Sequence, residues 1–256
     1  MMTSDSNGIK QNSPPYFSYS NRMKIVTWNC NGALRKKYQL LAEFDADLLI
    51  IQECEDPDRS TPEYKKWADN FLWIGGNKNK GIGIFSRKAI SIKAMNWNPE
   101  GLQSFLPCIV NDSFILVAVW IKQANSPAFK YIGQLWKYLQ LHKEKFVDND
   151  VLLCGDFNSN SIWDVWDRWW NHADVVNELE NHNIKSIYHS LLDEEQGKET
   201  QPTFFLHRRK EKPYHIDYAF VSKNLINHED SFFIGEPENW LEYSDHMPIV
   251  FTVNAS

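Results

Sequence analysis

Seven short apolar runs constrain the fold of this 256-residue chain more than any other feature of its sequence. Each run is rich in β-branched residues and is bounded by polar residues, which is the pattern of buried strands. The runs are 25–28, 48–51, 83–85, 114–121, 151–154, 218–221 and 249–253. Between them, segments 34–44, 62–71, 131–145 and 172–183 have apolar residues three or four positions apart, as in amphipathic helices. Strands covered by helices predict an α/β or α+β sandwich rather than an all-β barrel.

The chain divides into a short leader and one long domain. Residues 1–22 are rich in Ser, Asn and Pro and have no helical or strand period, so we expect a disordered leader. Residues 23–256 contain no Gly/Ser linker, no block of like charges and no internal repeat. We therefore expect residues 23–256 to fold as a single domain.

Composition excludes several classes of protein. Hydrophobic residues make up 43% of the chain and aromatic residues 14%, which is too apolar for a disordered protein or a coiled coil. The 27 Lys and Arg residues against 33 Asp and Glu residues leave a net charge of −6, which argues against a protein that coats nucleic acid non-specifically. A local basic surface is not excluded.

Cysteine usage and hydropathy indicate the compartment. Cys30, Cys54, Cys108 and Cys154 form no C-x-x-C pair, so we expect reduced thiols in the core. The chain shows neither an apolar run long enough for a membrane span nor the apolar stretch of a signal peptide. We therefore expect a cytoplasmic protein that does not use a membrane.

Polar side chains collect at the ends of the predicted strands. Some directly follow a strand, and others directly precede one of the last two strands. If those last two strands run antiparallel to the earlier ones, all these groups reach one edge of the sandwich. The following set is Asn29, Glu53, Asp156 and Asn158, and the preceding set is Asp217, Asp245 and His246.

Four carboxylates at one edge repel each other unless a cation offsets their charge. The four are Glu53, Asp156, Asp217 and Asp245. Oxygen ligands together with Asn favour hard divalent ions, so the sequence predicts a Mg²⁺ or Mn²⁺ site. His246 adds a group that titrates near neutral pH, or that stays charged beside a carboxylate. A metal, carboxylates and a His are the means of hydrolysing phosphate esters.

Five short motifs carry a family resemblance. They are Thr27-Trp28-Asn29-Cys30-Asn31-Gly32, Ile51-Gln52-Glu53, Gly155-Asp156-Phe157-Asn158, His215-Ile216-Asp217-Tyr218 and Ser244-Asp245-His246-Met247-Pro248. In this order they resemble the endonuclease/exonuclease/phosphatase superfamily, whose members include deoxyribonuclease-I-like and exonuclease-III-like enzymes, over about residues 23–253. The resemblance implies a four-layer sandwich, with two mixed β-sheets packed face to face and helices outside. It also makes the domain at 23–256 a catalytic domain.

The resemblance implies a role for each motif residue. Glu53 would bind the metal, helped by Asn29 and Asp245. Asp156 would position or deprotonate the attacking water, and Asn158 would hold a phosphate oxygen. His246, paired with Asp217, would stabilise the transition state, and Asn31 would contact substrate.

Each role has a structural alternative. Asn29 could cap a turn, Glu53 could be an ordinary acid that opens the loop after its strand, and Asp156 with Asn158 could form an Asx turn. Asp217 could be a charge at a strand edge, and His246 a satisfied buried histidine.

Two positions depart from the family pattern. Many relatives have a His or Tyr where this chain has Trp120, and an indole cannot act as a general acid. We expect Trp120 to line the substrate site, with Lys122 or Tyr131 as substitutes for the missing group. His215 stands where abasic endonucleases tend to have Arg, which makes an abasic-site specialist less secure.

Two further segments have open interpretations. Trp163, Trp166, Trp169 and Trp170 have helical spacing and would form either a core helix face or a surface for base stacking or a partner. The basic stretch 207–212 would be a solvated hairpin or a loop that contacts phosphate. We assign its Arg208, Arg209 and Lys210 to substrate binding.

These features favour a divalent-metal-dependent phosphodiesterase, and within that class a nuclease acting on DNA or RNA. A phosphatase acting on a small or lipid-head-group phosphate ester is one alternative. A catalytically silent binding module is another. We expect a nucleic acid partner and take a monomer as the default.

Overall fold

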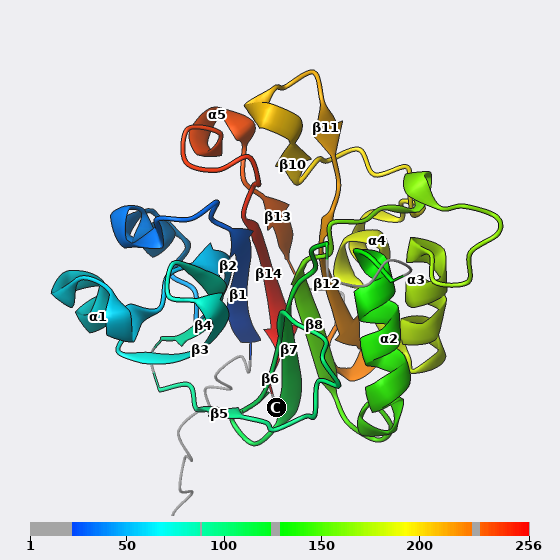
Figure 1. Cartoon of the computed structure of the whole chain (residues 1–256), viewed down its shortest axis with the longest axis horizontal. Helices are drawn as coiled ribbons and strands as arrows, with labels where there is room; N and C mark the ends of the chain where they lie inside the picture. The colour runs from blue at the N-terminus through cyan, green and yellow to red at the C-terminus, as the bar shows by residue number, and fades with distance from the viewer. Residues whose placement is uncertain (1–21, 88, 124–128, 227–230, 256) are drawn as a thin grey trace, which may run out of the picture.

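The computed structural model of the chain describes residues 22–87, 89–123, 129–226 and 231–255 (Figure 1). The expected leader lies outside the described residues, except for Arg22. Arg22 begins strand β1 (Arg22–Asn29) and pairs with Asn254, so the expected leader is one residue too long at this end. No described helix is long and apolar enough to cross a membrane.

Two six-stranded mixed sheets form the centre of the molecule. The first has the order β13-β14-β1-β2-β4-β3, and its other strands are β2 (Leu48–Cys54), β3 (Asn70–Asn77), β4 (Lys80–Ser86), β13 (Phe232–Ile234) and β14 (Ile249–Asn254). The second has the order β5-β6-β7-β8-β12-β9, with strands β5 (Ile92–Ala94), β6 (Phe105–Val110), β7 (Phe114–Trp120), β8 (Val151–Asp156), β9 (Ile184–Ser186) and β12 (Asp217–Ser222).

Helices cover the outer faces of these sheets (Figure 1). Helices α2 (Ile132–His142) and α3 (His172–Asn181) lie on the second sheet, with α4 (Ile187–Leu192) beside them. Helix α1 (Pro62–Trp67) and the 3₁₀ turns at Leu34–Lys36 and Tyr38–Phe44 lie on the side of the first sheet. The short α5 (Pro237–Trp240) lies near the two-stranded ribbon of β10 (Phe204–Phe205) and β11 (Pro213–Tyr214). The expected four-layer sandwich is confirmed.

Strand β7 shows how the layers pack. Leu116, Ala118 and Trp120 join the core between the two sheets, whereas Val117 and Val119 pack toward α2 and α3 on the outer face. Because a strand's side chains alternate between its two faces, a strand that is covered on both sides must be apolar at almost every position. This explains why β7 reads as a continuous apolar run.

Each sheet contains one parallel pair at its centre, β1 with β2 and β7 with β8, and its other strand pairs are antiparallel. Parallel strands end at the same edge of a sheet. Strand β14 is antiparallel to β1, and β12 is antiparallel to β8, so both begin where their neighbours end. The polar groups after β1, β2 and β8 therefore meet the groups that precede β14 and begin β12, as the sequence predicts. We call this shared edge the rim.

Two of the predicted helices are wrong in part. Segment 34–44 forms two 3₁₀ stretches rather than one α-helix, because Ala33 and Asp45 are left-handed and Lys37 is non-helical. Segment 62–71 is helical only to Trp67, after which the chain enters edge strand β3. The apolar residues at the start of β3 pack in a sheet. Over so few residues, the spacing of apolar positions does not distinguish a strand from a helix.

The tryptophan segment is not a helix, and most of it is not core. A 3₁₀ turn at Ser161–Trp163 ends at Asp164, which is extended because its carboxylate caps the start of α3 through His172 and Ala173 N–H. Trp166 is 96% exposed, Trp169 64% and Trp163 45%. Of the two interpretations of this segment, the core helix face is therefore wrong. The four cysteines, by contrast, are buried and free, as predicted.

Candidate active site

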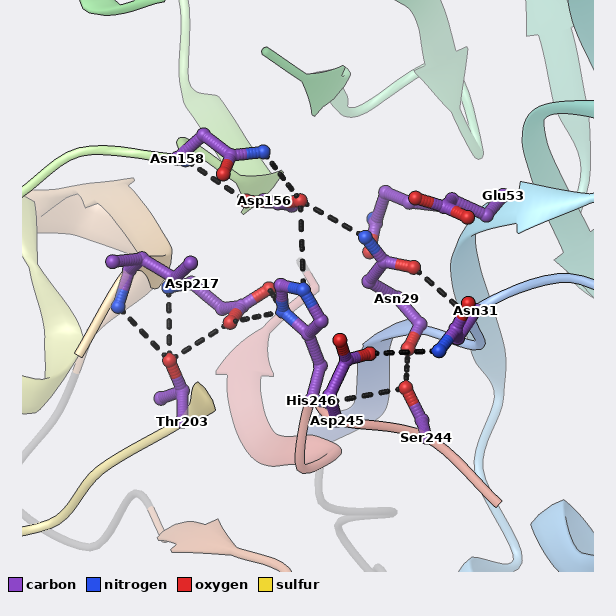
Figure 2. Close-up of polar contacts among 12 residues, drawn as sticks. Asn29, Asn31, Glu53, Asp156, Asn158, Thr203, Asp217, Ser244, Asp245 and His246 are labelled. Carbon is purple, nitrogen blue, oxygen red and sulfur yellow. Dashed lines mark hydrogen bonds and ion pairs between the residues drawn. The ribbon is translucent and has the colours of Figure 1, made fainter. Parts of the chain in front are cut away.

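Side chains from both sheets converge at the rim (Figure 2). Asn29 ends β1, Asp156 ends β8, and Asp217 begins β12 directly opposite Asp156 in the strand register. Asp245 and His246 lie in the turn before β14. The structure thus brings the motif residues of the sequence together, although they are separated by up to 217 positions.

Asp217 and His246 form a buried pair. His246 Nδ1 lies 2.9 Å from Asp217 Oδ2 and 3.1 Å from Oδ1. Thr203 Oγ1 donates to Asp217 Oδ2 at 2.8 Å and accepts from the Asp217 backbone N–H at 3.0 Å. These contacts hold the carboxylate in place, so the imidazole is oriented with Nε2 facing Asp156 at 4.0 Å.

Asp156 is the centre of the hydrogen-bond network in Figure 2. Its Oδ2 accepts from Asn29 Nδ2 at 2.9 Å and from Asn158 Nδ2 at 3.0 Å, and its Oδ1 accepts from the Asn158 N–H at 2.8 Å. Asn158 Nδ2 also donates to the Ile121 carbonyl at 2.8 Å. Both amide hydrogens of Asn158 are therefore engaged, and in this geometry the side chain positions Asp156.

Burial and charge shift the ionisation of this network. Burial, together with the nearby Asp217 carboxylate, raises the pKa of Asp156 from 3.8 to about 7. Burial alone lowers the pKa of His246, but the carboxylates of Asp217 and Asp156 more than offset it and raise that pKa to about 9. The structure thus places a charged imidazolium beside a carboxyl group that titrates near neutral pH.

A second group of oxygens lies on the other side of Asn29. Asn29 Oδ1 accepts from the Asn31 N–H at 3.0 Å, and Asn31 Nδ2 donates to Asp245 Oδ1 at 3.0 Å. Ser244 Oγ donates to the Asn29 carbonyl at 2.7 Å and accepts from the His246 N–H at 3.0 Å. Ser244 therefore fixes the turn that carries Asp245 and His246 against the end of β1.

Glu53 reaches the rim through an irregularity in β2. The register with β4 shifts between Gln52 and Cys54, and Glu53 has a φ of 61°. Such a bulge redirects a side chain that strict alternation would send elsewhere. Its side chain is 18% exposed, and its carboxylate forms an ion pair with Lys80 Nζ. A cation from the protein itself therefore neutralises Glu53 in this structure.

These donors suit a divalent ion. The carboxylates of Glu53 and Asp245 and the amide oxygen of Asn29 are hard ligands, and Lys80 shows that the position of Glu53 attracts positive charge. Among the described residues, Asp156, Asp217 and His246 also form a group whose ligand atoms all lie within 4.8 Å of one another. The donor set is therefore suited to hold a metal ion at the rim.

The strand next to β8 is held very close to it. Gly155 has a φ of +140°, and a Cβ there would lie 1.9 Å from the Val119 carbonyl oxygen, so only glycine fits. Trp120 is register partner of Asp156, is 8% exposed and belongs to the core between the sheets. Lys122 Nζ lies 4.3 Å from the Trp120 ring centroid. Trp120 thus borders the site mainly as a packed wall.

The basic stretch forms the loop of the β10–β11 ribbon. Arg208 donates to the carbonyls of Glu242 and Tyr243, at 3.1 and 3.5 Å, and Lys210 pairs with Glu238. Arg208, Arg209 and Lys210 are all exposed. The stretch is thus the loop of a hairpin, and two of the three cations assigned to substrate binding tie it to the segment around α5.

Sequence reasoning missed two residues of the site. Thr203 orients Asp217, and Lys80 neutralises Glu53, yet neither belongs to a motif. Thr203 lies fourteen positions before Asp217 in the sequence, and the ribbon between them folds so that the two side chains are in contact. No signal in the sequence marks either residue.

Comparisons with known proteins agree with the geometry. A family model described as Endonuclease/Exonuclease/phosphatase family matches residues 26–246. A search of curated proteins returns no match. The fold resembles a 3′-5′ exonuclease (NExo) from Neisseria meningitidis with a TM-score of 0.65 and 20% identity, covering 90% of this chain and 98% of that one.

Two other solved structures are also similar. A 3′ phosphatase NExo from Neisseria bound to product DNA hairpin has a TM-score of 0.66 at 20% identity, covering 91% of this chain and 99% of that one. An AP endonuclease from Archaeoglobus fulgidus has a TM-score of 0.61 at 18% identity, covering 90% and 98%. At such identities these matches establish the fold. Since the family model spans most of the sequence, the chain belongs to the endonuclease/exonuclease/phosphatase family.

Proposed function

We propose that the protein is a divalent-metal-dependent phosphodiesterase that cleaves nucleic acid. One observation carries the proposal: the buried Asp217–His246 pair faces the buried Asp156 carboxyl group at 4.0 Å, beside the oxygens of Asn29 and Asp245. A charged donor and a carboxyl group on one small surface suit the attack of water on a phosphate ester.

The residues divide the work of this reaction. His246, held charged by Asp217, donates a hydrogen bond to the phosphoryl oxygen on which negative charge grows. Asp156, with a pKa raised to about 7, orients the attacking water and accepts its proton. Asn29 and Asn158 hold Asp156 in place through its carboxylate oxygens.

The proposal assigns Mg²⁺ or Mn²⁺ to Glu53 and Asp245, assisted by the amide oxygen of Asn29. The ion, when bound, supplies positive charge to the phosphoryl group. Lys80 must then leave Glu53. Asn31, which bonds Asp245, lies exposed at the same edge and would contact substrate.

Nucleic acid is the proposed substrate for two reasons. Similar folds belong to a 3′-5′ exonuclease and to a phosphatase whose structure holds a product DNA hairpin. In this chain, the exposed cations Arg208, Arg209 and Lys210 lie on a ribbon whose first strand bridges to His246 through Phe204, so they can meet phosphates beyond the scissile one. We take the expected domain at 23–256, extended by Arg22, as one catalytic domain that acts as a cytoplasmic monomer.

A parallel assay tests the proposal. Purified protein is given Mg²⁺ or Mn²⁺ and tested on plasmid, abasic duplex, single-stranded DNA, structured RNA, phosphoinositides and bis-p-nitrophenyl phosphate. The His246→Ala variant, purified identically, reports contaminating nuclease. We expect the wild-type protein to cleave a nucleic acid in a metal-dependent reaction, and the variant not to cleave it. Turnover of phosphoinositides alone would replace the nuclease with the lipid-head-group phosphatase, and metal-independent binding without turnover would favour a silent module.

The basic ribbon offers a second arm. Changing Arg208, Arg209 and Lys210 together to Gln should raise KM for oligonucleotides and reduce the salt dependence of KM by up to about three units of slope. A matched triple change at Lys65, Lys66 and Lys143, which lie away from the rim, controls for net charge. If the two triple variants change KM and its salt dependence equally, the ribbon does not contact the substrate.

A further inference from the structure

Lys37, which belongs to none of the sequence motifs, joins two segments of the rim. Its Nζ donates to the Cys30 carbonyl and to the Tyr243 carbonyl, each at 2.6 Å. Cys30 directly follows Asn29, and Tyr243 lies two positions before Asp245. One ammonium group thus connects the two segments that carry Asn29 and Asp245, although Lys37 and Tyr243 are 206 positions apart in the sequence.

The position of Lys37 is fixed by its own surroundings. Its backbone lies between the two 3₁₀ stretches, and its N–H donates to the Leu34 carbonyl at 2.8 Å. Leu34 is fully buried, and the neighbouring Arg35 forms an ion pair with Glu55, which directly follows β2. The segment is therefore anchored both to the core and to the end of β2, so the ammonium group is held where it reaches both carbonyls.

Two further hydrogen bonds link the same segments. Trp28 Nε1 donates to the His246 carbonyl at 3.0 Å, and Ser244 Oγ donates to the Asn29 carbonyl at 2.7 Å (Figure 2). Both of these bonds join neutral groups. Lys37 adds a charged donor, and hydrogen bonds from a charged donor are about twice as strong as those between neutral groups. We therefore expect the separation of the two segments to depend strongly on Lys37.

This separation matters for the ion. Asn31 lies between the two proposed ligands: its N–H donates to Asn29 Oδ1 and its Nδ2 donates to Asp245 Oδ1, each at 3.0 Å. Mg²⁺ requires ligand oxygens at about 2.0–2.1 Å in a nearly octahedral arrangement, so a small shift of one segment against the other weakens binding. Groups that hold metal ligands in place typically change metal affinity about 10- to 100-fold when they are removed.

We propose that Lys37 is a positioning residue, which holds the segment around Asn29 and the turn around Asp245 at a fixed separation and thereby sets the affinity of the rim for its divalent ion. The inference rests on the proposed function, because it takes the ion and two of its ligands from there. Lys37 acts through the main chain, since its ammonium group is bound to the Cys30 and Tyr243 carbonyls.

Hydrogen exchange tests the hold on the turn without any metal. In this turn the Ser244 N–H donates to the Trp240 carbonyl and the His246 N–H to Ser244 Oγ, both at 3.0 Å. With a chelator present, both amides should exchange about tenfold faster in Lys37→Met than in wild type. Lys36→Met is the matched control, because Lys36 is exposed and its loss removes the same charge one position earlier. Its amides should exchange as in wild type.

Mn²⁺ binding, measured by calorimetry and by electron paramagnetic resonance, tests the consequence for the ion. Lys37→Met should raise the dissociation constant about 10- to 100-fold. Lys36→Met should change it by about twofold or less, because solvent screens an exposed charge. In turnover assays, Lys37→Met should raise the Mg²⁺ concentration for half-maximal rate by the same factor. Its kcat at saturating Mg²⁺ should fall by less than about tenfold, because Lys37 is outside the reacting groups.

A chemical variant separates the hydrogen bonds from the charge. The thiol of Lys37→Cys is alkylated with 2-bromoethylamine, which restores an ammonium group with three donors, or with (2-bromoethyl)trimethylammonium, which restores the charge without a donor. The four native cysteines are buried, and wild type treated in the same way reports any reaction there. We expect the ammonium form to recover most of the Mn²⁺ affinity and the trimethylammonium form to recover little.

Folding is checked by thermal melts in chelator, followed by circular dichroism. Burial lowers the pKa of Lys37, so removal of its charge also removes a cost of desolvation, and we expect Lys37→Met to fold. If Lys37→Met melts early, the two alkylated forms of Lys37→Cys give the comparison in its place, because they differ only in the groups on the terminal nitrogen.

The outcomes separate this inference from the proposed function. Faster exchange and weaker Mn²⁺ binding in Lys37→Met support the role of Lys37 even if wild type cleaves no nucleic acid, in which case only the nuclease proposal falls. Unchanged exchange or unchanged Mn²⁺ affinity in Lys37→Met overturns the inference and leaves a metal-dependent nuclease in place. Equal effects of Lys37→Met and Lys36→Met, or full recovery with trimethylammonium, also overturn the inference.

Discussion

The Asp217→Asn variant gives the sharpest test of the site, because the charge of Asp217 controls the protonation of His246. The pKa of His246 is raised from 6.5 to about 9, and at 1.36 kcal/mol per pKa unit the difference corresponds to about 3 kcal/mol in favour of the imidazolium. Asp217 is the largest favourable contributor, since it lies 2.9 Å from Nδ1. Without Asp217, the effect of burial is opposed mainly by the Asp156 and Asp245 carboxylates, so the pKa of His246 should fall.

The consequence is measurable in three ways. The His246 ring resonance, followed by NMR, should titrate near pH 9 in wild type and well below that in Asp217→Asn. A histidine whose folded pKa is raised stabilises the fold below its unfolded pKa of 6.5, and this contribution is lost as pH rises through about 9. Unfolding free energies between pH 6.5 and 9 should therefore fall in wild type and change less in the variant.

The kinetic result completes the test. Asp217→Asn and His246→Ala should each lower kcat by about 10² or more, and the double variant should lose little beyond either single one, because the pair acts as a unit. Thr203→Val keeps both charges and removes the hydrogen bond to the Asp217 carboxylate, together with the acceptor of the Ile216 and Asp217 N–H groups, so it should cost about tenfold or less in kcat. Additive losses in the double variant, or a His246 that still titrates near 9 in Asp217→Asn, would refute the pairing.

Metal removal and four further variants probe other parts of the molecule. Exhaustive chelation should abolish turnover, and Glu53→Gln should raise the Mg²⁺ concentration needed for half-maximal rate. Lys80→Met should tighten Mn²⁺ binding measured by calorimetry, because the ion then no longer has to displace the lysine from Glu53. Trp120→Phe should cost less than about tenfold in kcat and leave the pH profile unchanged, because the only polar group lost is an indole N–H, which does not titrate. A shifted alkaline limb would contradict this. Burial alone would raise the pKa of Glu199, but hydrogen bonds, above all from His189, lower this pKa from 4.5 to about 2. Ionised Glu199 therefore adds up to about 3 kcal/mol to the free energy of unfolding above pH 4.5, and this contribution is lost as the pH falls toward 2. Glu199→Gln should accordingly lower the melting temperature at pH 7 and much less at pH 3, and an equal loss at both would rule out the charge as the cause.

The strands of the two central parallel pairs could be predicted from the sequence because burial on both faces leaves an unmistakable apolar run. Edge strands such as β3 and β5 lack that signal, since one face meets solvent and their residues are mixed. The same limit explains the tryptophan segment. Its spacing fits a helix, but Asp164 caps α3 and ends the turn, a contact between residues that local periodicity does not register.

The motif residues of the site were predictable because each stands at a strand end, and because β14 and β12 run antiparallel to their neighbours. Their identity and their common edge thus follow from the sequence. What only the tertiary structure decided are the contacts made by residues without a motif: Thr203 on Asp217, Lys80 on Glu53, and the tryptophans beside Asn158. The physical reason is that hydrogen bonds and ion pairs depend on positions in space to a few tenths of an ångström, whereas sequence patterns report only which face of a strand or helix a residue occupies.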